Sequence, residues 1–182
     1  MTNGASSFRR IVVADEGERS KVIADGPTPD VRTDPARPGF AAARMWVTDR
    51  TPIALKHLRE SLHLPHMLEP PPGGSVCRIF TFPPDAAWRD RVGRSDVDAY
   101  FAAMGSPQAS TCEADGPHPY MQKTRTLDLC LVLEGEITLV LDTEEVHLRA
   151  GDTLVQRGTS HAWSNRSDKP CVIAISSHDA AG

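Results

Sequence analysis

The sequence lacks the features that support disulfide-stabilised, nucleic-acid-binding and membrane-spanning proteins. Its four cysteines are scattered without a C-x-x-C pair, so we expect free thiols rather than a disulfide framework. The net charge is −4 at pH 7 and no basic run occurs, which argues against nucleic acid or a membrane surface as a partner. No apolar stretch approaches a membrane span, and the first residues lack the apolar core of a signal peptide. These observations predict a cytoplasmic protein.

Length and composition favour one globular domain with irregular connections. A chain of 182 residues with 40% hydrophobic content is long enough to bury a core without disulfide or metal cross-links. Aromatic residues are few, at 5%, whereas prolines (15) and glycines (13) are many. Proline interrupts helices and central strands, so these numbers predict long connecting segments.

The segment from Gly116 to Asn165 carries the clearest pattern in the chain. Polar and hydrophobic residues alternate strictly in its first half, which is typical of a half-buried β-strand with two different faces. One face holds Leu127, Leu129, Leu131 and Leu133, and the other holds Gln122, Thr124, Thr126, Asp128 and Cys130.

Turns divide this segment into several short strands. We expect Glu134-Gly135-Glu136 to form a turn after the first strand, and the alternation resumes at Ile137, so the two runs predict a hairpin. A second turn is expected at Ala150-Gly151-Asp152. Short strands separated by Gly and Asp turns favour an all-β sandwich or barrel.

The region before this segment adds strands and helices to the predicted fold. Residues 8–24 have a hairpin signature around residues 15–18. Ser95 as N-cap, acids in the first turn and a terminal Gly105 predict a helix over 96–104. Apolar residues also follow a helical spacing over 53–64. Further strands are expected over residues 40–48, 76–82 and 171–176.

The spacing of the glycines and polar residues resembles the two cupin motifs. The first cupin motif has the form G-x5-H-x-H-x3-E-x6-G and is matched in spacing by Gly116, Gln122, Thr124, Asp128 and Gly135. The second resembles G-x5-P-x-G-x2-H-x3-N and is followed, one residue short, by Gly151, Gln156, Gly158, His161 and Asn165. The resemblance implies an all-β fold, a single cupin-like jelly-roll β-barrel with a small-molecule cavity.

In this interpretation residues 111–182 form the cupin barrel core. Residues 1–110 form an N-terminal extension that contributes strands, loops and the short helix (96–104) to the same domain. One or two short helices are expected in all.

Only two of the four residues at the metal-ligand positions of the cupin motifs are strong metal ligands here. Cupins hold a divalent metal with two His, a Glu and a further His, and this chain has Gln122, Thr124, Asp128 and His161 instead. Because Zn, Fe and Mn sites need at least three strong donors, no metal cofactor is favoured. If a divalent metal binds, His118 shares the parity of the polar face and completes the set His118, Asp128 and His161. Pro117 and Pro119 make regular strand geometry around His118 doubtful.

His161 and Asp128 are the candidate catalytic residues. A histidine titrates near neutral pH and can act as a general acid or base, although it can also be a hydrogen-bonded core residue. A carboxylate in an apolar barrel is costly unless it is paired, and Asp128 paired with His161 makes proton abstraction from carbon feasible. The alternative for Asp128 is a backbone hydrogen bond near the barrel mouth.

Several other residues are candidates for substrate binding. Gln122, Thr124 and Thr126 could orient polar groups of a substrate. Cys130 and Trp163 could line the cavity wall, although both residue types are also common in cores. Three arginines could bind a substrate carboxylate, but the sequence does not place them: Arg37, Arg44 and Arg78.

These residues favour a small-molecule-transforming enzyme of the lyase or isomerase type. A dehydratase, decarboxylase or isomerase acting on a small oxygen-rich metabolite by proton transfer fits them best. The alternatives are a non-catalytic cupin that binds or senses a ligand, a metal-dependent cupin with an atypical ligand set, and a structural dimerisation module. The leucine-rich face of residues 127–133 needs a cover, which the opposite sheet, the N-terminal strands or a second copy could supply. By analogy with other small cupins we expect a homodimer.

Overall fold

The computed structural model describes residues 8–55 and 60–181, and most of their regular structure is β-strand. The prediction of an all-β fold with few helices is confirmed. The strands are β1 (Arg9–Glu16), β2 (Arg19–Pro27), β3 (Val31–Thr33), β4 (Ala41–Thr48), β5 (Ser75–Phe82), β6 (Thr126–Glu134), β7 (Glu136–Val140), β8 (Glu145–Arg149), β9 (Thr153–Arg157), β10 (Ala162–Ser164) and β11 (Cys171–Asp179). The helices that lie wholly within the described residues are α1 (Arg94–Ala103) and the short 3-10 helices η2 (Asp85–Ala87), η3 (Arg89–Arg91) and η4 (Pro107–Ala109).

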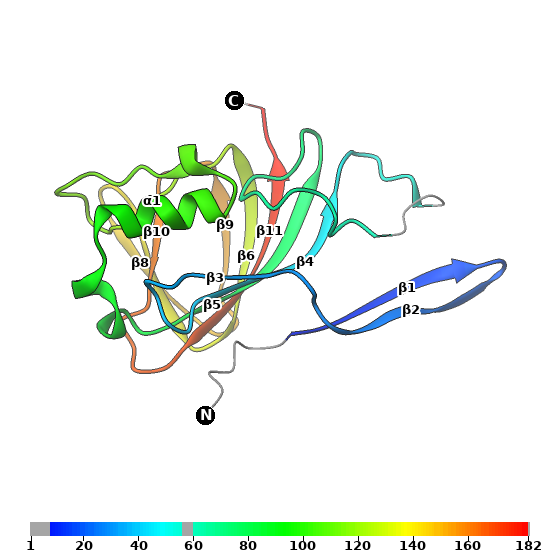
Figure 1. Cartoon of the computed structure of the whole chain (residues 1–182), viewed down its shortest axis with the longest axis horizontal. Helices are drawn as coiled ribbons and strands as arrows, with labels where there is room; N and C mark the ends of the chain where they lie inside the picture. The colour runs from blue at the N-terminus through cyan, green and yellow to red at the C-terminus, as the bar shows by residue number, and fades with distance from the viewer. Residues whose placement is uncertain (1–7, 56–59, 182) are drawn as a thin grey trace.

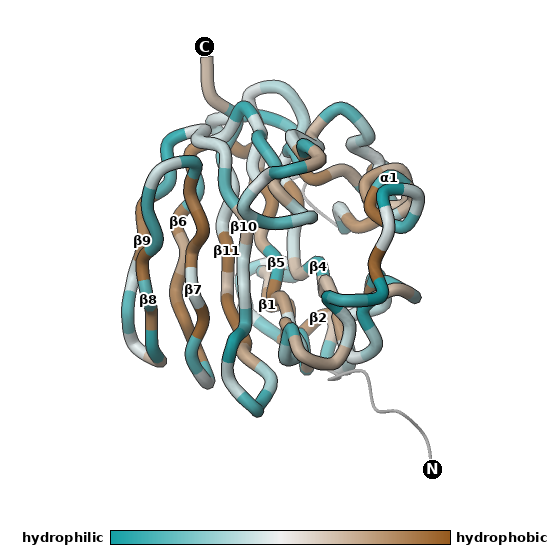
Figure 2. The backbone as a smooth tube through the Cα atoms, turned by 90° about the vertical axis from the view of Figure 1, so that its left-hand side faces the viewer, coloured by the Kyte–Doolittle hydropathy of each residue, from teal (hydrophilic) through white to brown (hydrophobic). Residues whose placement is uncertain are grey.

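Two sheets enclose one hydrophobic core. A six-stranded sheet has the order β3-β4-β5-β11-β6-β9, and a three-stranded sheet has the order β10-β7-β8. Hydrophobic residues recur along β6, β7 and β11 (Figure 2), and side chains from both sheets join the same buried cluster. Strands from residues 1–110 and from 111–182 therefore lie next to each other in one sheet, because β5 pairs with β11.

The alternation seen in the sequence of β6 separates a buried polar face from an exposed leucine face. Thr126, Asp128 and Cys130 point into the barrel and are buried, as the sequence predicted. The four leucines on the opposite side are 38–47% exposed. We call Leu127, Leu129, Leu131 and Leu133 the leucine face. Neither the opposite sheet nor the N-terminal strands cover it in the described part of the chain, so these two predicted covers were wrong.

The turn at residues 134–136 is a corner between the sheets and not the predicted hairpin. β6 pairs with β11 and β9, whereas β7 pairs with β8 and β10. Gly135 has φ +77°, and a Cβ atom there would lie 2.8 Å from the carbonyl oxygen of Pro170. A chain that changes sheets within two residues needs such a tight bend. The pattern had correctly indicated two strands but not their partners.

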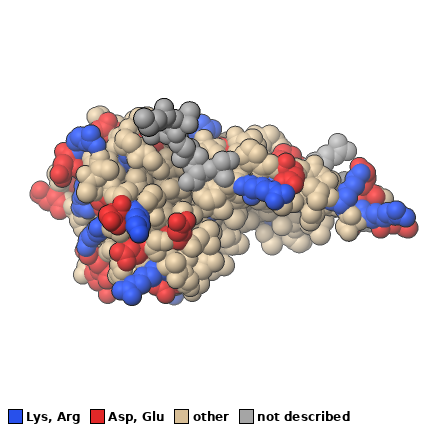
Figure 3. All heavy atoms as spheres, turned by 90° about the horizontal axis from the view of Figure 1, so that it is seen from below, with Lys and Arg blue, Asp and Glu red and all other residues tan. Residues whose placement is uncertain are grey.

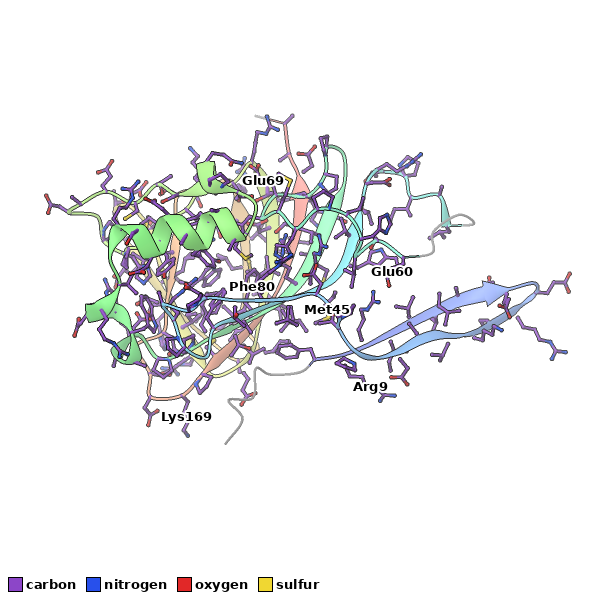
Figure 4. The ribbon with its side chains drawn as sticks, in the orientation of Figure 1. Arg9, Met45, Glu60, Glu69, Phe80 and Lys169 are labelled. Atoms are coloured by element: carbon purple, nitrogen blue, oxygen red, sulfur yellow. The ribbon has the colours of Figure 1, made fainter. Side chains whose placement is uncertain are left out.

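The first two strands form the predicted hairpin, which leaves the barrel as an arm (Figures 1 and 3). Arg10 fastens its base, because its guanidinium is 2.6 Å from a carboxylate oxygen of Glu60 and donates to the carbonyl of Met45. Figure 4 labels Met45 and Glu60 on the barrel side of this junction. Hydrophobic side chains on the arm are about half exposed or more, namely Ile11, Val13, Val22 and Ile23.

The helix α1 lies across the barrel on the side away from the arm (Figure 1). Its N-cap is Gly93, whose N–H donates to the Asp96 carboxylate at 2.9 Å, so the predicted cap at Ser95 was wrong by two residues. The predicted terminal glycine, Gly105, is confirmed with φ +68°. The helix buries Val97, Tyr100 and Phe101 against the barrel.

The helical spacing over residues 53–64 is only partly covered by the structure. Residues 56–59 lie outside the described residues, and residues 60–64 form turns and irregular chain. All four cysteines are free thiols, as expected. Within residues 8–55 and 60–181, no helix has the length and apolar character that crossing a membrane requires.

We predict that Gly135→Ala destabilises the protein more than Gly151→Ala does. Both glycines have positive φ, which costs an L-residue about 1–2 kcal/mol, but a Cβ at Gly151 meets no atom within 4 Å. The contact with Pro170 should add roughly 1–3 kcal/mol at Gly135. Urea unfolding of both variants measures the difference, and equal losses would show that the corner tolerates a side chain.

We also predict that a second copy of the chain covers the leucine face. The double variant Leu129→Lys, Leu131→Lys should then be a folded monomer, because buried ammonium groups are costly. Val146→Lys is the control, since Val146 is 38% exposed on the other sheet and should leave the dimer intact. Light scattering after gel filtration gives the mass, and a monomeric wild-type protein would contradict the homodimer.

Candidate functional site

Strand register brings a row of polar side chains together inside the barrel. Asp128 on β6 lies opposite Gln156 on β9 and opposite Ser177 on β11. All three are at most 7% exposed. Because antiparallel partners point to the same face of a sheet, these three side chains face the interior side by side.

His161 and Gln122 close this polar layer from the other side. Their backbones form an isolated antiparallel bridge, in which the two N···O distances are 2.8 and 2.9 Å. The side-chain Nε2 atoms of the two residues are 3.2 Å apart, and Nδ1 of His161 is 3.0 Å from the carbonyl oxygen of Thr159. A carbonyl only accepts, so Nδ1 carries the proton and Nε2 accepts from the Gln122 amide. We call Gln122, Asp128, Gln156 and His161 the polar layer.

Burial keeps His161 neutral. Its side chain is only 3% exposed, and loss of hydration lowers its pKa below the usual value. The hydrogen bond to Thr159 and the nearby charge of Asp128 oppose that decrease in pKa. At neutral pH the histidine therefore has a free-base Nε2 whose lone pair is held by one amide N–H.

Asp128 lies in the same interior as His161, but the two do not form the hydrogen-bonded pair that the sequence suggested. The group that orients the imidazole is the carbonyl of Thr159. Asp128 Oδ1 is buried with no hydrogen-bond partner among the described residues, as are Gln156 Oε1 and Arg78 Nε. Two neighbouring strands thus leave oxygen acceptors unsatisfied at one place, which is the signature of a site for water or a ligand.

The predicted substrate-binding residues lie in different environments. Thr126 is buried and its hydroxyl is 2.8 Å from that of Thr124. Both threonines line an outer groove of about 590 Å³ at the start of β6. Cys130 is buried in the hydrophobic core, where desolvation raises its pKa to about 12, and it is not among the residues that line the interior cavity.

A small cavity lies inside the barrel next to the polar layer. Its volume is about 30 Å³, which is room for one or two waters or for a carboxylate group, since one water needs roughly 10–15 Å³. Trp163 lines it, as the sequence had suggested. Figure 4 labels Phe80, another wall residue, within the barrel. The lining residues are Arg37, Leu68, Phe80, Phe82, Tyr100, Tyr120, Gln122, Trp163 and Ile175.

His118 lies apart from Asp128 and His161, so the metal set proposed from the sequence is not assembled. Its Nε2 is 4.0 Å from a carboxylate oxygen of Asp85, and burial lowers its pKa to about 3. Among the described residues no three His, Cys, Asp or Glu side chains group closely enough for a metal ion. Both ring nitrogens of His161 are also engaged. The residues at the cupin ligand positions therefore do not fit a divalent metal.

Some residues of the site were not identified from the sequence. Gln156 is one of them, although its position in the second cupin motif could have indicated that it belongs to the site. Arg44 donates to backbone carbonyls of residues 62–65. Arg78 donates to the carbonyls of residues 67 and 68. Arg37 is the arginine that lines the cavity.

Part of the barrel is similar to proteins of a known family. Residues 113–177 match the family model described as "Cupin domain". "Phomopsin biosynthesis cluster protein D" of Diaporthe leptostromiformis is 51% identical over 89 residues, 43% of this chain and 47% of that protein. "Cupin-domain-containing oxidoreductase virC" of Hypocrea virens is 35% identical over 80 residues, 38% of this chain and 41% of that protein. The chain spans less than half the length of these curated relatives.

A similar solved structure is the cupin domain of Cnp3 from Schizosaccharomyces pombe. It is 8% identical with a TM-score of 0.46, and the match covers 94% of this chain and 87% of that one.

We predict that acid destabilises the protein between pH 6.5 and 5 through its buried histidines. Burial lowers the pKa of His66 to about 4, that of His118 to about 3, and that of His161 in the same direction. Below pH 6.5 the unfolded chain binds protons that the folded chain does not, so stability is present above that pH and falls as pH falls. Each histidine contributes at most about 1.4 kcal/mol per pH unit.

Urea unfolding at each pH measures this slope. His161→Asn should reduce it by about one histidine's share, because burial lowers the pKa of His161. An unchanged slope in His161→Asn would mean that His161 is protonated in the folded protein.

Proposed function

Because the chain carries a cupin domain, we propose that it binds a small oxygen-rich metabolite inside the barrel and transforms it by proton transfer at His161. The observation that supports this best is the protonation state and orientation of the His161 imidazole. It is a buried, neutral imidazole, its tautomer is set by Thr159, and Nε2 is directed at the amide of Gln122. A general base of this kind works at neutral pH.

The proton has a defined path in this proposal. A C–H bond next to a carbonyl breaks, the proton moves to Nε2 of His161, and the electron pair moves onto the carbonyl oxygen as an enolate. Gln122 must release Nε2 first, and its amide N–H then donates to the new oxyanion. The Thr159 carbonyl accepts from Nδ1–H throughout and stabilises the imidazolium. Return of the proton to another carbon gives an isomerase, and expulsion of a β-hydroxyl group, which takes that proton and leaves as water, gives a dehydratase. In a decarboxylase the C–CO₂ bond breaks in place of the C–H bond, its electron pair forms the same enolate, and the carbon then takes a proton from water.

Asp128 has a supporting role. Its carboxylate stands in the same buried layer and favours the imidazolium through space, since its charge acts to raise the pKa of His161. Its Oδ1, which has no hydrogen-bond partner among the described residues, also gives a substrate hydroxyl an acceptor. The name of the phomopsin relative agrees with small-molecule chemistry, because it assigns that protein to a biosynthesis cluster.

A second candidate function is a non-catalytic cupin that binds or senses a ligand. The observation in its favour is that Gln122 satisfies Nε2 of His161 in the structure, as in a purely structural pair. The two functions differ in whether a carbon-bound proton is exchanged.

The test is proton–deuterium exchange followed by NMR in D₂O, with pyruvate, oxaloacetate and acetoacetate as probes. Wild-type protein should accelerate exchange at carbon, and His161→Asn should lower the rate by about 10²–10⁴-fold, the usual contribution of a general base. Asp128→Asn should lower it less, because Asp128 acts through space. Glu136→Gln, an exposed change on β7, is the control. Binding of a probe without any exchange would support the binding protein instead.

Metal content distinguishes a third alternative, a metal-dependent cupin with an atypical ligand set, from metal-free proton transfer. One relative is named an oxidoreductase, and a metal-dependent reaction would need an ion here. The protein is purified without chelators or nickel columns and compared with Asp128→Ala and His161→Ala. Stoichiometric metal that both substitutions remove would contradict metal-free proton transfer, whereas metal-free protein that exchanges protons would support it.

A further inference from the structure

Arg37 lies in a turn between β3 and β4 that presents its side chain to the barrel interior. Asp34 organises this turn, because its carboxylate accepts from the N–H of Ala36 at 3.0 Å and its carbonyl accepts from the N–H of Arg37 at 3.1 Å. Arg37 is only 3% exposed and Asp34 only 4%. A charged side chain placed this deeply needs compensating contacts.

Asp34 and three aromatic rings hold the guanidinium in one orientation. Its Nε donates to Asp34 Oδ2 at 2.7 Å, and the hydroxyl of Tyr120 donates to the same oxygen at 2.8 Å. The guanidinium carbon lies 3.6 Å from the ring centre of Tyr120, 4.0 Å from that of Phe40 and 4.4 Å from that of Tyr100. Aromatic faces attract a cation at these distances. The fork of N–H groups is therefore rigid before any ligand arrives.

One end of this fork is unused. Arg37 Nη2 is buried and has no hydrogen-bond partner among the described residues. Arg37 is also the cationic side chain in the lining of the interior cavity. Gln122 lines the same cavity and contacts His161. A buried donor without an acceptor costs free energy, and an acceptor placed in the cavity would recover it.

We propose that Arg37 binds a carboxylate group of the ligand in this cavity. The inference rests on the proposed function only in taking this ligand to be the substrate. The cavity of about 30 Å³ has room for two water-sized groups, since one water needs about 10–15 Å³, and the two oxygens of a carboxylate are groups of that size. A charge-assisted hydrogen bond from a guanidinium to a carboxylate is stronger than one to a neutral carbonyl. The substrate class is thus a small carboxylic acid with its reacting carbon near Gln122 and His161.

Charges at the outer groove also favour an anion. Lys123, Arg125 and Arg157 line the groove that reaches the inward-facing Thr126, and among the described residues Glu69 is the one acidic side chain in its lining. The Glu69 carboxylate is already occupied, since it accepts from the backbone N–H of Arg125 at 2.8 Å. An excess of positive charge around a concave surface raises the local concentration of anions.

The test compares acetate with acetamide, which has the same shape and no charge. At constant ionic strength, acetate should raise the thermal midpoint of the wild-type protein and change its tryptophan fluorescence, because Trp163 lines the cavity. Acetamide should do neither at the same concentration. Equal effects of the two compounds would overturn the proposal, because neither would then depend on the charge of Arg37.

The double variant Asp34→Asn, Arg37→Gln removes the buried pair together, so no single charge is left unpaired. It should bind acetate at least tenfold more weakly. The matched control is Arg9→Gln, Asp25→Asn, an exposed Arg–Asp pair on the arm with a 2.6 Å contact, which should bind like wild type. Unchanged acetate affinity in the Asp34, Arg37 variant would place the anion elsewhere.

A measurement on the wild-type protein covers the case in which the buried variant does not fold. Isotope-filtered NOEs from ¹³C-acetate should reach ring protons of Tyr100 and Tyr120, and NOEs confined to other residues would contradict the site. His161→Asn separates this proposal from the proposed function. Acetate binding that persists in that variant supports the Arg37 site whether or not the wild type exchanges protons, and loss of acetate binding there would contradict it.

Discussion

The interior of this barrel is governed by the cost of burying polar groups away from water. Asp128, Gln156, His161 and Gln122 all face inward, and each buried polar atom that makes no hydrogen bond there costs free energy. His161 makes its hydrogen bonds as a neutral imidazole between Thr159 and Gln122. Asp128 and Gln156 do so incompletely, with one free oxygen each. This unequal satisfaction distinguishes a candidate site from an ordinary core.

The polar layer and the cavity lined by Arg37 have one residue in common. Gln122 belongs to both, because it holds His161 on one side and lines the cavity of Arg37 on the other. A ligand that satisfies Arg37 would therefore lie next to the amide that covers the base. Binding and chemistry are coupled in the proposal through this one side chain. The aromatic residues, few in the sequence, are concentrated here, with Tyr100, Tyr120 and Trp163 in the cavity wall.

The outside of the barrel poses the opposite problem, since apolar groups there meet water. The leucine face and the arm β1–β2 leave hydrophobic side chains exposed, and a two-stranded hairpin is marginal on its own. Arg10 fixes only the base of the arm. The exposed apolar surface is consistent with the predicted homodimer, which would leave the interior site within each protomer.

The sequence by itself determined the local features of this protein: the strands, the two faces of β6 and the cupin resemblance all follow from residue spacing within short segments. The buried parity of Thr126, Asp128 and Cys130 was predictable because alternation in a strand is a local property. Tertiary structure alone decided strand partners, so the expected hairpin at Gly135 became a corner between sheets. It also separated His118 from Asp128, and it joined Asp34 to Tyr120 across 86 residues. Such contacts depend on how distant segments share the limited space of one core, and residue spacing carries no record of that.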